Sequence, residues 1–192
     1  SVGRTVEESL LKAARSLEIG VNHLYMKKFD GFTEDEMLAY IKDGTDDRIY
    51  AIAELLRRGT DVGMICNATK IDMLFLEKIS NIVRAEDKLK EHIGDIDTLY
   101  AAKRLGFSDE YIGRLWDMTG EEIFRIREKH NMFPVYKMID TCASEFESYI
   151  PYFYSTYEQE NESEVSDKEK IIVLGSGPIR IGQGVEFDYS TV

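Results

Sequence analysis

The sequence predicts a mainly α-helical protein: a helical domain of short and medium helices, plus a truncated α/β stub of one strand and a glycine loop near the C-terminus. Apolar residues recur every three or four positions between helix-start and helix-stop residues over the first 131 positions, which is the period of an amphipathic helix. The same stretch contains no proline and no clear alternating strand pattern. A buried-strand pattern followed by a glycine-rich turn comes only after residue 170 and predicts the start of an α/β unit.

Three helices are predicted between residues 5 and 59. The first two begin with the spacing of a capping box, at Thr5–Glu8 and Thr33–Glu36, where a hydroxyl and a carboxylate can satisfy free backbone N–H groups. The third begins at Asp46 or Asp47. The expected stops are Gly20, Gly44 and Gly59. The apolar positions behind these starts are Leu10, Leu11, Ala14, Leu17, Met37, Leu38, Ile41, Ile49, Ile52, Leu55 and Leu56.

A longer helix is predicted over 69–91, followed by three short ones over 97–105, 108–117 and 119–130. The apolar face of the longer helix comprises Ile71, Leu74, Phe75, Ile79, Ile82 and Val83. The boundaries of the short helices come from Gly106, Ser108, the Thr119–Glu122 pair and Asn131, which can end a helix in the left-handed conformation.

The pattern changes after Phe133. Residues 132–169 are expected to form an irregular connecting segment, because Pro134 breaks the helical pattern and an acidic run over 158–169 is typical of a solvated linker. Ile171–Leu174 is predicted to be a buried strand, with a glycine-rich turn after it. The glycines of this turn are Gly175, Gly177, Gly182 and Gly184. They could let backbone N–H groups approach a phosphate, or they could serve only as a strand-to-helix turn.

Composition excludes several classes of protein. The 192 residues are 43% hydrophobic, which is enough for a core, and carry 24 basic against 36 acidic residues for a net charge of −12. A nucleic-acid partner is therefore not expected. No run of apolar residues is long enough for a membrane span, so we expect no membrane partner and a cytoplasmic location. Cys66 and Cys142 match no metal-ligand spacing, and no metal site is predicted.

Residues alone do not assign a catalytic group. Trp116 with Tyr111 and Leu115 could form an interface, since tryptophan and tyrosine often dominate interfaces, or they could be a core-facing stripe. The three histidines are distant in sequence and are expected at helix ends or on the surface. The short helices between 104 and 131 have the spacing of a helix-turn-helix but lack the basic second helix that DNA readout needs.

The glycine-rich segment resembles a known family. Ile172–Tyr189 is similar to the opening of the second synthetase half in the large subunit of the carbamoyl phosphate synthase family, and the form Arg180–Gly184 is typical of that half. Upstream segments that resemble the same family, in the same order, are Gly3–Ser9, Asn67–Asp72, Pro134–Phe146 and Tyr154–Glu158.

The resemblance implies five regions. These are a C-terminal helix remnant of the first ATP-grasp half (1–20), a connector with a short helix (21–44), the helical oligomerisation domain (45–131), the irregular connecting segment (132–169) and the truncated start of the second synthetase, or pre-ATP-grasp, domain (170–192).

The function implied by the resemblance is a non-catalytic oligomerisation and spacer segment that associates with other large subunits. The full-length enzyme would be a ligase that makes carbamoyl phosphate from bicarbonate, two ATP with Mg²⁺ or Mn²⁺, and ammonia that a small glutaminase subunit releases from glutamine. It would serve arginine or pyrimidine biosynthesis. Arg180 and Glu186 would border the carbamate passage, or only brace the turn. No synthase activity and no cofactor are expected for this segment alone. The alternative is a nucleotide-binding module through Gly175–Gly184.

Overall fold

A computed structural model describes residues 1–17, 19–140, 142, 145–146 and 152–172. Its elements, in order, are α1 (Val6–Ser16), a 3₁₀ turn (Lys27–Phe29), α2 (Glu34–Tyr40), α3 (Arg48–Arg57), α4 (Val62–Thr69), α5 (Met73–Glu91), α6 (Ile96–Arg104), α7 (Asp109–Trp116), α8 (Gly120–Lys129), β1 (Val135–Met138) and β2 (Phe153–Thr156). The prediction of a mainly helical protein is confirmed. Within these residues no helix has both the length and the apolar character needed to cross a membrane.

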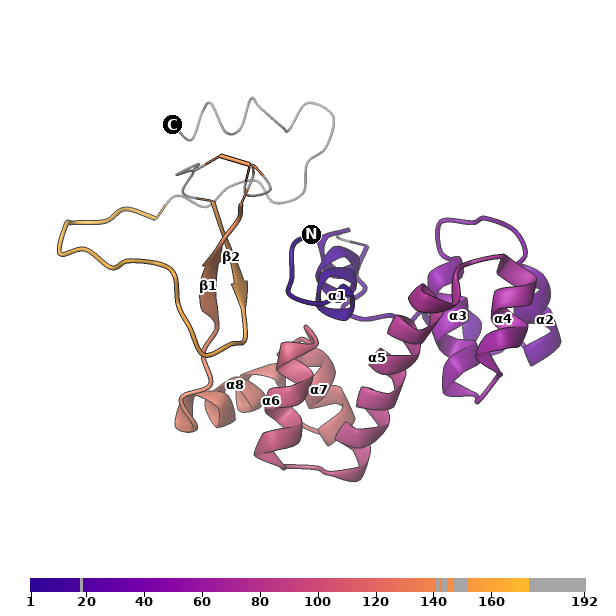
Figure 1. The fold of residues 1–192 in the computed structure, drawn as a ribbon. Coiled ribbons are helices and arrows are strands. Elements are labelled where there is room, and N and C mark those ends of the chain that lie inside the picture. The colour runs from indigo at the N-terminus through magenta and orange to yellow at the C-terminus, as the bar shows by residue number, and fades with distance from the viewer. Residues whose placement is uncertain (18, 141, 143–144, 147–151, 173–192) are drawn as a thin grey trace.

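The longest helix, α5, connects two groups of helices (Figure 1). At its N-terminal end it packs with α3 and α4, and α2 packs on α3. It also contacts α6 and α7, and α7 packs closely on α8. The first helix, α1, contacts α5 as well. The β1–β2 hairpin lies at the opposite end of the molecule from α2, α3 and α4 (Figure 1).

The predicted helix starts are confirmed in most cases. Complete capping boxes form at Thr33–Glu36 before α2 and at Thr119–Glu122 before α8. At α1 the box is only half made: the Thr5 hydroxyl accepts from the Glu8 backbone N–H, but the Glu8 carboxylate accepts from the N–H of Arg4 at 2.7 Å. Asp47 is the residue before α3, although its side chain makes no capping bond.

The helix predicted over 69–91 is wrong at its start. Residues Val62–Thr69 form a separate helix, α4, which the prediction missed, and α5 begins only at Met73. Lys70 separates the two helices because it adopts the left-handed conformation (φ 60°), and the Asp72 side chain then caps α5 by accepting from the Leu74 N–H at 2.8 Å. The left-handed stop predicted at Asn131 is confirmed (φ 53°).

One hydrophobic cluster includes side chains from all the helices and from the segment before α2. Its largest fully buried members are Leu11, Leu24, Phe29, Met37, Ile41, Ile52, Leu55, Ile65, Leu76, Ile82, Leu89 and Phe107. The regions expected at 1–20 and 21–44 therefore share a core with the helices of 45–131. The five regional boundaries themselves stay predictions.

The segment 132–169 is not irregular throughout. β1 and β2 pair antiparallel, with Val135 opposite Thr156 and Met138 opposite Phe153. Lys137 points inward from β1, with its side chain only 7% exposed, and its ammonium lies 3.1 Å from the Glu162 carboxylate. The strand predicted at Ile171–Leu174 is described only at its first two residues, which are almost fully exposed and belong to no strand.

Candidate functional site

The candidate residues of the glycine-rich segment lie outside the described part of the chain. They are Gly175, Gly177, Arg180, Gly182, Gly184 and Glu186. Their roles in a carbamate passage or a phosphate site stay predictions.

The candidate interface of α7 lies largely in the core. Trp116 and Tyr111 are 3% and 6% exposed, and Leu115 is half-buried. The indole N–H of Trp116 donates to the Leu89 carbonyl at 2.7 Å, and the Tyr111 ring stacks on His23 with ring centroids 3.7 Å apart. Trp116 and Tyr111 therefore face the core, and a surface open to a partner lies elsewhere on the domain.

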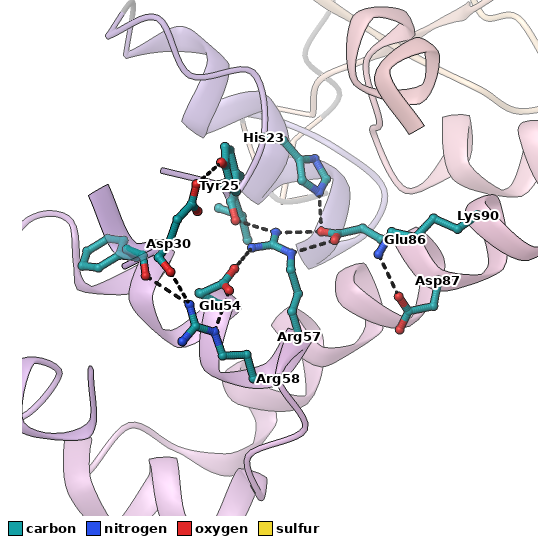
Figure 2. A network of polar contacts seen from close by, with 11 residues as sticks. His23, Tyr25, Asp30, Glu54, Arg57, Arg58, Glu86, Asp87 and Lys90 are labelled. Atoms are coloured by element: carbon teal, nitrogen blue, oxygen red, sulfur yellow. Dashed lines mark hydrogen bonds and ion pairs between the residues drawn. The ribbon is translucent and has the colours of Figure 1, made fainter. Parts of the chain in front are cut away.

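A buried polar network joins α3, α5 and the segment after α1 (Figure 2). Glu86 of α5 is 1% exposed, and its carboxylate accepts from Arg57 Nε at 2.7 Å and Nη2 at 2.8 Å. The same carboxylate lies 2.8 Å from Nε2 of His23, which is also 1% exposed. Arg57 in turn donates to the Leu24 carbonyl at 2.6 Å. The expectation of a surface or helix-end position for His23 is wrong.

The network fixes the charges of its members. Burial by itself would raise the pKa of Glu86, but the hydrogen bonds from Arg57 and His23 outweigh it and lower this pKa to about 2. Burial lowers the pKa of His23 despite its contact with Glu86, so the imidazole is neutral at pH 7 and donates from Nε2. The Glu86–Arg57 ion pair therefore accepts one further hydrogen bond, from a neutral histidine.

A second ionic cluster joins α6, α7 and α8. Asp109, in the first turn of α7, accepts from Arg127 of α8 at 2.5 Å and from Lys103 of α6 at 2.8 Å. Burial would raise the pKa of Asp109, but the hydrogen bonds and charges of these two cations lower it. The ring of Tyr157, just after β2, lies over both cations, at 5.1 Å from Lys103 and 5.6 Å from Arg127.

Both clusters pair their carboxylates with groups of the same chain. Glu86, only 1% exposed, accepts from the Arg57 guanidinium and from the neutral His23 imidazole, and Asp109 lies between the cations of Lys103 and Arg127. No group of three or more histidine, cysteine or acidic side chains within the described ranges could hold a metal ion. A pocket of about 520 Å³ between α1, α5 and α6 is lined by Glu7, Asn81, Arg84, Lys88, Asp97, Thr98 and apolar residues.

The structure shows an exposed apolar corner where α4 meets α5, a location that the sequence does not predict. We define the α4–α5 corner as four residues, Met64, Met73, Leu74 and Phe75, which are 50%, 43%, 58% and 54% exposed. Leu74 and Phe75 belong to the apolar face predicted for a longer helix over 69–91. The Asp72 cap starts α5 at Met73, so these residues lie in its first turn, ahead of the buried stripe of Leu76, Ile79, Ile82 and Val83.

These features define a class of protein: a helical domain with one hydrophobic core and two buried ionic clusters, whose described residues include an exposed apolar corner. The comparison with known families then identifies it. Residues 1–131 match the family described as carbamoyl-phosphate synthetase large chain, oligomerisation domain, and residues 167–192 match the carbamoyl phosphate synthase preATP-grasp domain. The first match covers 131 of 192 residues, so the chain belongs to the carbamoyl-phosphate synthetase large-chain family. The resemblance inferred from the sequence is confirmed.

Proposed function

We propose that residues 1–131 form an assembly module, through which copies of the large chain associate and the two catalytic halves are held apart. The observation that carries the proposal is the match of these residues to a family described as an oligomerisation domain. The fold supports it, because one continuous core with two buried ionic clusters makes a rigid unit suited to joining larger bodies.

In this proposal the catalytic chemistry belongs to the rest of the large chain. The full-length enzyme makes carbamoyl phosphate from bicarbonate, two ATP with Mg²⁺ or Mn²⁺, and ammonia from a small glutaminase subunit in the cytoplasm. The segment 167–192, which matches the preATP-grasp domain, begins the second half, and Arg180 and Glu186 border its carbamate passage.

Co-purification of two differently tagged copies of the 192-residue chain tests self-association. We expect capture of one tag to retain the other copy when both are mixed at tens of micromolar. If the second copy is never retained with the captured one, the result contradicts the proposal. An ATP titration of the same chain is expected to show no tight binding, and micromolar affinity would favour a nucleotide-binding module through Gly175–Gly184 instead.

A further inference from the structure

The α4–α5 corner is an apolar surface that the core of this domain does not require. Consecutive helical residues are rotated by about 100° from one another, so Met73, Leu74 and Phe75 cannot all face the core beside Leu76. Leu76 is fully buried, whereas the three residues before it each expose about half of their side chains. Polar residues at these positions would leave the core unchanged, which makes the apolar surface itself the feature to explain.

The size of the corner matches one side of a modest protein interface. Large apolar side chains each offer about 150–250 Å² when fully exposed, so four that are half exposed present on the order of 400 Å². A standard interface buries roughly 800 Å² from each partner, a little over half of it apolar. The corner therefore supplies most of the apolar area that one copy would need, and a polar rim would supply the rest.

The position of the corner separates it from the domain that follows. The chain enters the preATP-grasp match at residue 167, after the β1–β2 hairpin, and the hairpin lies at the opposite end of the molecule from α3 and α4 (Figure 1). The corner is at the α3–α4 end, since α5 begins there. A partner that covers it approaches from the end away from this junction.

We propose that the α4–α5 corner is the self-association surface and that a second copy of this chain covers it. The inference rests on the proposed function, which supplies the kind of partner, and it adds where that partner binds. Closed dimers of one chain use the same patch on both copies, so the corner of one copy packs against the corner of the other. Leu74 and Phe75, as the most exposed members, are the anchors of the contact.

Sedimentation velocity of the whole 192-residue chain tests the surface. The variant Leu74→Glu/Phe75→Glu places like charges at the centre of the contact, and Leu74→Ser removes apolar surface without adding charge. The matched control is Ile93→Glu, because Ile93 is 61% exposed just beyond the other end of α5. We expect the double variant to weaken the dimer Kd by at least ~30-fold, the effect of losing one strong interface residue. Leu74→Ser should weaken it less, and Ile93→Glu should match the original chain.

Each outcome separates the surface from the proposed function. Dimers that persist in both corner variants overturn the surface assignment and leave self-association intact. Equal weakening by Ile93→Glu also overturns it, because the effect would then not be specific to the corner. An original chain that stays monomeric at every concentration overturns the proposed function and the surface together. Far-UV circular dichroism on each variant checks that the helices are retained, and Leu74→Ser decides the outcome if the double variant is unfolded.

Discussion

Replacing Glu86 by glutamine is expected to destabilise the helical domain by about 3–5 kcal/mol, the usual cost of removing one partner from a buried ion pair. The replacement keeps the size of the side chain but removes its charge. Arg57, whose side chain is 14% exposed, would lose the carboxylate that accepts from its Nε and Nη2. Glutamine keeps only one oxygen acceptor, so it cannot accept from Arg57 Nε, Arg57 Nη2 and His23 Nε2 as the two carboxylate oxygens do.

The pKa of Glu86 gives the same magnitude by a separate route. Its fall from 4.5 to about 2 corresponds to roughly 3 kcal/mol, at about 1.4 kcal/mol for each pKa unit. Because this pKa is lower in the folded state than in the unfolded chain, the stabilisation is fully present above pH 4.5. It is lost as the pH falls from 4.5 toward 2, where the carboxylate takes up a proton in both states.

Urea unfolding followed by circular dichroism measures the effect. The matched control is Glu77→Gln, which removes an exposed carboxylate 3.5 Å from Arg84 on the same helix, where a loss of at most about 1 kcal/mol is expected. The gap in stability between the original chain and Glu86→Gln should shrink as the pH is lowered from 5 to 3. A gap below 1 kcal/mol at pH 7, or one that does not change with pH, would refute the reasoning.

Three further predictions follow from local contacts. Asp109→Asn leaves the charges of Lys103 and Arg127 without their carboxylate and should cost about 3 kcal/mol in urea unfolding, against almost nothing for Glu121→Gln in an exposed pair. Gly113→Ala would place a Cβ 2.5 Å from the Met118 carbonyl oxygen and should lower the melting temperature by several degrees, whereas Gly31→Ala meets nothing within 4 Å and should leave it unchanged. Trp116 is the single tryptophan and is buried, so its fluorescence should be blue-shifted in the folded chain and should shift red in the same urea range as the loss of helix; a red-shifted folded spectrum would contradict its core position.

Helix boundaries could be predicted from the sequence where a local device sets them. The capping boxes before α2 and α8 need only a threonine and a glutamate three residues apart, so they can be recognised without tertiary information. The stop at Asn131 is equally local. The break at Lys70 was missed because lysine has no intrinsic preference for the left-handed conformation that it adopts there. The helix α4 was not predicted because Ile65 is its single buried residue, and one buried position does not make a helical stripe.

Long-range pairing could not be predicted. The β1–β2 hairpin joins residues 15 to 21 positions apart, and its inward residue Lys137 is charged, which removes the alternation that marks a strand. Glu86 continues the spacing of Leu76, Ile79 and Val83 on the buried face of α5, yet the sequence is rich in acidic residues and gives no sign of its partners. Arg57 and His23 lie 29 and 63 positions away, so only the fold brings these three side chains together.

Light scattering behind size exclusion, over a hundredfold range of protein concentration, tests the central claim most directly. The account predicts a mass that rises from 22.1 kDa, the mass of one chain, to about twice that value as the concentration increases. A mass that stays at that of one chain over the whole range would contradict the claim that this helical domain is sufficient for self-association.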